Sequence, residues 1–170
     1  MRTQVQRATV LIAVVICTRA GTAARADDKT ATDAGPPKTG HVMMLAPSDL
    51  TWTAGPPALP SGARMSLIEG APSSAGPFTF RLRFPAEYRI PPHWHPRAVH
   101  VTVISGTFHM GLGDRFDPKK GDSLPAGGIT VMPEQIHHFG WASEETIIQV
   151  HGIGPWEINY LDPTNDPRPH

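Results

Sequence analysis

The chain has few of the residues on which several classes of protein depend. Its 170 residues include one cysteine, Cys17, and its 15 basic and 15 acidic residues balance to a formal net charge of zero. The absence of a lysine and arginine cluster argues against a nucleic-acid binder. No apolar run reaches the roughly 18 residues that a membrane-spanning helix requires.

Glycine and proline are abundant instead. The chain has 16 glycines and 19 prolines, about a fifth of its residues against an average of roughly 12%. Long helices tolerate so much glycine and proline poorly, so short strands joined by turns are the better expectation. The length suits a single domain.

The first 26 residues have the three-part pattern of a secretory signal peptide. Arg2 and Arg7 give a positive start, residues 8–17 form an apolar run, and an A-x-A cleavage site ends at Ala26. The alternative is a short anchor that stays attached, but the run is too short to cross a bilayer. The pattern predicts a periplasmic or secreted protein that the membrane does not hold after cleavage.

Cleavage would remove Cys17 and four arginines, and it would leave a net charge of −4. A chain without thiols forms no disulfide and has no cysteine nucleophile or ligand. Any metal ion must then be held by histidine, aspartate or glutamate. Residues 27–40 are polar without apolar periodicity, which predicts a flexible lead-in to a domain over residues 41–170.

The domain carries the alternating pattern of short strands. Apolar and polar residues alternate with a period of two over 78–84 and again over 99–103. Many short strands at regular spacing predict an all-β sandwich or barrel with a core and an interior cavity. Further strands are expected at 107–110, 129–132, 137–141, 146–151 and 158–161.

Histidines carry the candidate chemistry. His93 and His95 are two residues apart at the expected start of a strand, so both rings can face the same side. His137 and His138 come later, and a second strand can bring one of them to the same point. Three neutral imidazoles make a divalent metal site with open positions for water or substrate. If the H-x-H pattern is taken alone, the alternative to a metal site is that one or both histidines are simply surface groups.

The sequence resembles the cupin superfamily, and most of all small secreted bacterial single-domain cupins. His93, His95 and Gly106 match the first cupin motif, G-x5-H-x-H-x3,4-E-x6-G, and Gly127 and Pro133 match the second, G-x5-P-x-G-x2-H-x3-N, whose histidine is His138. The strings PHWHP, VTVISGTF and HGIGPW are similar to those of the secreted subgroup. The resemblance implies a cupin-type β-barrel, a double-stranded β-helix or jelly roll, with one bound metal and often a homodimer.

Three other motif positions hold different residues. Ala86 or Glu87 stands where the first motif has its leading glycine. Gln135 replaces the second glycine of the later motif, and Ala142 replaces its final asparagine.

The metal-binding glutamate of the first motif is also missing. Counting back from the closing glycine puts its position at Val99, and counting the longer spacing from His95 puts it at His100. Val99 belongs to the alternating apolar set, so we expect it to face the interior and His100 to face outward. The expected site is therefore formed by His93, His95 and His138.

Two further histidines remain secondary candidates for metal ligands. A β-bulge near residues 96–98 would shift the register and turn His100 inward. His137 should point away from His138, and it ranks second as the ligand from the later strand.

Five residues are candidates for lining the cavity beside the metal. Val99, Phe80 and Ile136 would supply apolar wall, although Phe80 and Ile136 are first of all core residues. Gln149 and His151 share a parity on a late strand. An exposed strand face is an equal alternative for these two, because alternation alone does not distinguish inside from outside.

A site without the glutamate leaves a dication with its full charge, which should attract a carboxylate or enolate. Iron, manganese, zinc, nickel and copper are all candidates, since imidazole does not select one metal. Some cupin dioxygenases use three histidines, so the resemblance implies an oxidoreductase, most simply a dioxygenase, acting on a small organic anion. The alternatives are an isomerase or lyase with Glu87, Tyr88 or His151 as general base, and a non-catalytic periplasmic module that binds or senses a small molecule.

Overall fold

The computed structural model describes residues 42–169, and the regular structure in this range is almost entirely β. The expected signal peptide over 1–26 and the lead-in over 27–40 lie outside the described residues. In the described part of the chain, no helix is long and apolar enough to cross a membrane.

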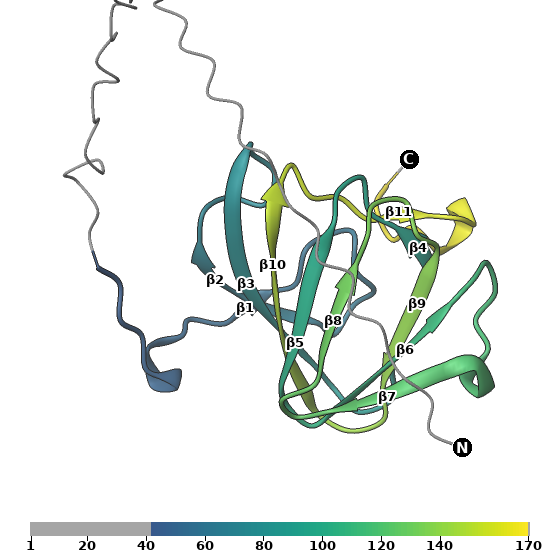
Figure 1. Cartoon of the computed structure of the whole chain (residues 1–170), viewed down its shortest axis with the longest axis horizontal. Coiled ribbons are helices and arrows are strands. Elements are labelled where there is room, and N and C mark those ends of the chain that lie inside the picture. Colours follow the sequence, from purple (N-terminus) through teal and green to yellow (C-terminus); the bar gives the residue numbers. More distant parts are fainter. Residues whose placement is uncertain (1–41, 170) are drawn as a thin grey trace, which may run out of the picture. The chain divides into compact units, whose positions relative to one another are not determined.

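The first sheet has six antiparallel strands in the order β1-β2-β3-β10-β5-β8 (Figure 1). Alternate residues of β3 and β5 are buried, as the period of two predicts. One face of this sheet is therefore apolar and covers the core. Its strands are β1 (Thr53–Ala54), β2 (Arg64–Glu69), β3 (Gly76–Phe84), β5 (Val99–Ser105), β8 (Ile129–Met132) and β10 (Thr146–Gly154).

The second sheet has five antiparallel strands in the order β11-β4-β9-β6-β7. The polar sequence GDSLP of β7 did not indicate a strand, and its pairing with β6 decides the conformation. Three single-turn 3-10 helices complete the described part: η1 (Pro47–Asp49), η2 (Pro118–Lys120) and η3 (Pro163–Asn165). The strands are β4 (Tyr88–Trp94), β6 (Thr107–Leu112), β7 (Gly121–Pro125), β9 (His138–Ala142) and β11 (Asn159–Tyr160).

The core fills the space between the two sheets. Phe84 of β3 stacks on Tyr88 and Phe108 of the second sheet, with ring centroids 4.7 and 5.8 Å apart. Tyr88 begins β4, whereas His93 lies near its end. Aromatic packing therefore fills the barrel at one end of β4 and leaves the other end to the histidines.

A bulge in β4 positions the site. Ile90 pairs with Gly140 and His93 with His138, so three steps along β4 match two along β9. The extra residue falls at Pro91–Pro92, where proline is tolerated because a ladder hydrogen bond is already lost. The bulge reverses the alternation, so that Ile90 and His93 are both buried. The sequence had suggested that His93 lies at the start of a strand. In the structure it lies near the end of β4.

Candidate metal centre

Three histidine rings meet inside the barrel. The ring centroids of His93 and His138 are 4.2 Å apart, and that of His95 is 5.0 Å from each. One ring nitrogen from each lies within 4.8 Å of the other two, and the residues are only 3–5% exposed. Among residues 42–169, this is the one group of three or more histidine, cysteine or acidic side chains that could hold a metal ion.

Main-chain carbonyls fix the orientation of each ring. The Nδ1 atom is 2.7 Å from a carbonyl oxygen in His93, 2.6 Å in His95 and 2.9 Å in His138. A carbonyl only accepts, so each Nδ1 carries the hydrogen and each Nε2 keeps a lone pair. Metal-binding histidines are held in this way by their second nitrogen, so the three residues fit a divalent ion. The accepting carbonyls belong to Pro91, Glu157 and Ile136.

Burial keeps the three rings uncharged at neutral pH. It lowers the pKa of His95 to about 4, with a further contribution from the neighbouring His138. The pKa of His93 lies well below its ordinary value and that of His138 is also lowered, in both cases chiefly by burial. Neutral imidazole is the form that binds a metal ion.

Val99 stands at the position of the missing glutamate and lines the cavity, with 2% of its surface exposed. His100 lies on the opposite face of β5, where its ring stacks on His151 at 4.8 Å and 7°. Residues 96–97 form a bend before β5, and the strand then begins with Val99 facing the cavity and pairs regularly with β8 over Val99–Thr102. The structure therefore excludes His100 from the cluster.

His137 also lies outside the cluster. Its ring is exposed, and Nδ1 is 2.7 Å from a carboxylate oxygen of Asp114. Consecutive side chains point to opposite sides of an extended chain, so the inward direction of His138 turns His137 toward solvent.

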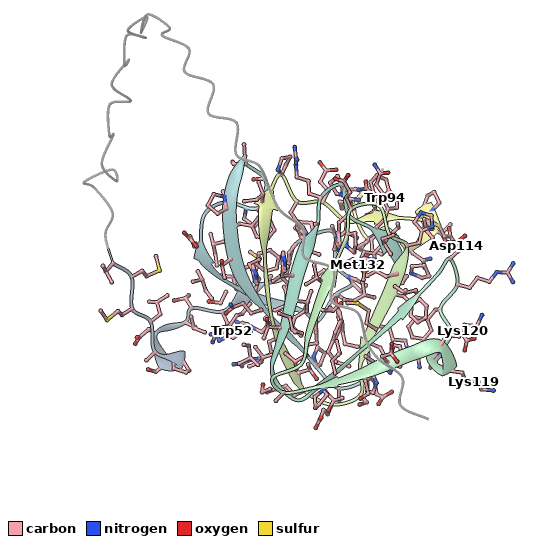
Figure 2. The ribbon with its side chains drawn as sticks, viewed as in Figure 1. Trp52, Trp94, Asp114, Lys119, Lys120 and Met132 are labelled. Carbon is pink, nitrogen blue, oxygen red and sulfur yellow. The ribbon has the colours of Figure 1, made fainter. Side chains whose placement is uncertain are left out.

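A small cavity of about 40 Å³ lies beside the three rings. Apart from the histidines, its wall is formed by apolar side chains and a glycine, with Val99, Met132 and Trp156 among them. Figure 2 shows Met132 between the sheets, whereas Trp94 and Asp114 lie toward the outside. Besides the three histidines, the wall carries one more polar side-chain group, the indole Nε1 of Trp156, which is buried without a hydrogen-bond partner.

Two predicted cavity residues lie on the other face of β10. Ile148 and Val150 point into the cavity, so Gln149 and His151, which alternate with them, face outward. The Oε1 atom of Gln149 accepts a hydrogen bond from Arg81 Nε at 3.1 Å. The alternative of an outer strand face is therefore the correct one for both residues.

The other two predicted wall residues are also displaced. Phe80 is fully buried, but it packs edge-on against Trp156, with centroids 5.2 Å apart, and does not line the cavity. Ile136 is 39% exposed and precedes β9. Of the five predicted residues, Val99 alone is part of the wall.

Two segments outside the strands supply wall residues that were not predicted from the sequence. Trp156 stacks over His95, with centroids 5.4 Å apart, and Leu59 comes from a proline-rich segment before β2. The phenol of Tyr160 donates to the Ala58 carbonyl at 2.7 Å and holds this segment in place. Trp156 is the last residue of the string HGIGPW, which indicated a resemblance but no place in the cavity. No local pattern indicates that residues near Leu59 fold over the barrel.

None of the three residues considered as general bases lines the cavity. Glu87 is exposed, His151 faces outward, and the Tyr88 phenol donates to the Pro60 carbonyl while burial raises its pKa. Among the described residues that form the wall, the three histidines are the only titratable ones.

Two residues that stand in place of motif glycines adopt left-handed backbone conformations. Glu87 has a φ of 60° and Gln135 a φ of 61°. For an L-residue this conformation costs about 1–2 kcal/mol. The Gln135 N–H donates to the His95 carbonyl at 2.8 Å, so this turn connects the two segments that supply the histidines.

Residues 41–157 match the protein family described as the ChrR cupin-like domain. No curated protein matches the chain.

Solved structures share the architecture. The polyketide cyclase RemF from Streptomyces resistomycificus has a TM-score of 0.58 and 13% identity, over 75% of this chain and 90% of that one. An RmlC-like cupin from Ralstonia eutropha has a TM-score of 0.56 and 21% identity, over 73% and 74%. A protein from Methylibium petroleiphilum, provisionally assigned as an acetylacetone dioxygenase, has a TM-score of 0.55 and 18% identity, over 79% and 91%. These similarities confirm the predicted cupin-type fold.

Proposed function

Because this chain belongs to the ChrR cupin-like domain family, we propose that His93, His95 and His138 hold one divalent metal ion that serves the oxidation of a small organic anion. The observation that carries the proposal is the orientation of the three rings. Each Nδ1 donates to a carbonyl, so three Nε2 lone pairs remain for an ion. The reaction class we propose is that of a dioxygenase.

The wall of the cavity supports an anionic substrate. Val99 supplies no negative charge where a carboxylate ligand would stand, so the charge of a bound dication is not reduced by the protein. The bound ion would supply a positive centre with open positions for an anion and dioxygen. Apolar residues such as Met132 and Trp156 exclude water around it and favour a substrate with a charged head and an apolar body.

Oxidation fits the site better than isomerisation or elimination. A protein-catalysed proton transfer requires a base within hydrogen-bond reach of the substrate. In the described cavity, the titratable residues are the three histidines that we assign to the metal. An isomerase or lyase would therefore lack a base of its own at this site.

A non-catalytic binding or sensing module is the second candidate, and Val99 favours it. A carboxylate would neutralise part of the charge of the ion, so its replacement by a buried valine should weaken the hold on metal. This alternative would be supported if the protein binds small anions but shows no turnover with any metal ion bound.

The test begins with elemental analysis of the exported protein purified from the periplasmic fraction of a bacterial host. We expect about one equivalent of metal, and oxygen uptake by iron-loaded protein with at least one member of a panel of carbonyl and phenol compounds. His95→Ala should lose both properties, and the outer-face variant His151→Ala should keep them. Turnover that persists without oxygen would favour the isomerase or lyase, and absence of turnover with every metal would contradict an enzyme.

We also propose that the protein works in the periplasm or outside the cell. The charged start, apolar run and A-x-A site of residues 1–26 support this location. N-terminal sequencing of exported protein should begin at Asp27, and retention of Met1 in the cytoplasm would contradict it. A homodimer, which the cupin resemblance implies, would give twice the chain mass by light scattering.

A further inference from the structure

The C-terminal segment, residues 158–169, lies beyond the residues that match the family, which end at 157. It nevertheless borders the metal centre. Tyr160 of β11 pairs with His93 of β4, and their rings are 5.9 Å apart. The Leu161 N–H donates to the Pro92 carbonyl at 3.1 Å. In Figure 1 this segment, in yellow, runs beside β4.

Arg168 ties the end of this segment back to its beginning. Its Nε and Nη2 atoms donate to the carboxylate of Asp166 at 2.8 and 2.6 Å. The same Nη2 donates to the carbonyl oxygen of Ile158 at 3.0 Å. A guanidinium can make these contacts together because its donors are held in one rigid plane. An ammonium group lacks that fixed arrangement.

The carbonyl that orients His95 lies between two anchored residues. The Trp156 N–H donates to the Pro72 carbonyl at 2.6 Å, and the Ile158 carbonyl accepts from Arg168. The Glu157 carbonyl, between them, accepts from His95 Nδ1 at 2.6 Å. Ile158 itself is only 2% exposed and lines the cavity. The short stretch 156–158 is therefore held from both ends and directs one carbonyl at a ring of the centre.

We propose that Arg168 is a positioning residue of the metal centre. Paired with Asp166, it fixes the backbone at Ile158, and through it the Glu157 carbonyl that sets the tautomer and direction of His95. The part of this inference that concerns metal affinity rests on the proposed function of the three histidines. Loss of a group that orients a ligand costs roughly 10–100-fold in metal affinity. Arg168 acts one step further back, so we expect about a tenfold loss, at the lower end of that range.

Cobalt(II) titration of the full chain tests the proposal. Arg168→Ala should bind cobalt about tenfold more weakly than the wild type, and Arg168→Lys should recover part of the loss. Arg64→Ala is the matched control, because Arg64 also donates to a carbonyl, that of Trp52 at 2.7 Å, but from β2. Its cobalt affinity should stay within twofold of the wild type. Thermal unfolding of each metal-free variant identifies any variant that fails to fold. If Arg168→Ala fails to fold, the cobalt affinity of Arg168→Lys decides whether Arg168 positions the metal centre.

Nitrogen-15 NMR of the His95 ring in metal-free protein provides a second readout. The wild type should show hydrogen on Nδ1, and Arg168→Ala should show a mixture of the two tautomers. Unchanged cobalt affinity with an unchanged tautomer would overturn the role of Arg168 and leave the proposed function intact. An equal loss of affinity in Arg64→Ala would also overturn it. A wild type that binds no cobalt would refute the proposed function, and the NMR result would still decide whether Arg168 positions His95.

Discussion

The barrel holds two groups of histidines that differ in what orients their rings. Inside, the rings of His93, His95 and His138 are each tied by Nδ1 to a main-chain carbonyl. Outside, His100 and His151 stack almost parallel, and the buried Nδ1 of His100 has no hydrogen-bond partner. Proximity is similar in both groups. A metal site also requires that lone pairs converge, and the carbonyls provide this inside the barrel.

The backbone explains why the two groups lie on different faces. His100 and His151 are directly opposite in the ladder between β5 and β10, whose alternation leaves both on the outer face. His93 follows the bulge at Pro91–Pro92, which turns it toward the interior beside His138. A local irregularity thus produces the inner group, and a regular ladder produces the outer one.

The largest expected effect distinguishes the two groups by metal affinity. His138→Ala leaves two imidazoles, so its affinity for cobalt(II) should fall by more than the roughly 10–100-fold that loss of an orienting partner costs. His151→Ala should change the affinity by less than about twofold, since its ring contacts only the outer face. Direct titration of both variants measures this, and equal losses would show that the outer pair contributes.

The second effect is the response of metal-free protein to acid. Because the pKa of His95 falls from 6.5 to about 4 in the fold, the unfolded chain binds a proton first as the pH is lowered. The contribution of His95 to the free energy of unfolding should hold its full value above pH 6.5 and drop by ~3 kcal/mol as the pH approaches 4. His93 and His138 should add to this loss, because burial lowers their pKa values as well. Urea denaturation across this range measures the slope. The slope should be smaller in His95→Gln than in the wild type, and the part contributed by His93 and His138 should remain.

A third variant introduces the missing carboxylate into the inner group. Val99→Glu should tighten cobalt binding about tenfold, equivalent to ~1.4 kcal/mol, because a negative charge would stand beside the ion. Without metal the same variant should unfold more easily, since a buried carboxylate lacks a partner. His100→Glu is the control on the outer face and should leave cobalt affinity unchanged. Weaker binding by Val99→Glu would contradict the assigned orientation of Val99.

The smallest effect separates backbone strain from metal binding. Gln135→Gly should raise the free energy of unfolding by about 1 kcal/mol, because glycine adopts the left-handed conformation at little cost. The N–H that binds the His95 carbonyl remains in this variant, so cobalt affinity should not fall. Glu87→Gly should stabilise the other left-handed turn by a similar amount. Urea denaturation that shows no gain in either variant would argue against strain.

Much of the barrel could be predicted because its strands keep a strict alternation. Residues 78–84 and 99–103 show it most clearly, and the structure places strands there. The strand Gly121–Pro125 could not be predicted, since its polar residues gain their conformation from pairing with β6. For the site, H-x-H and the later histidine pair indicated which side chains could converge. The Pro91 and Ile136 carbonyls lie two residues from the histidines that they orient, whereas the Glu157 carbonyl, which orients His95, comes from a distant part of the chain.

The sequence by itself determined the period of the strands, the supply of imidazoles and the absence of a glutamate beside them. Only the tertiary structure decided which face of β10 is buried and where β4 shifts its register. The reason is that alternation is symmetric: it separates residues into two sets without saying which set faces inward. The packing of two sheets resolves that choice, and one bulge can reverse it within a strand.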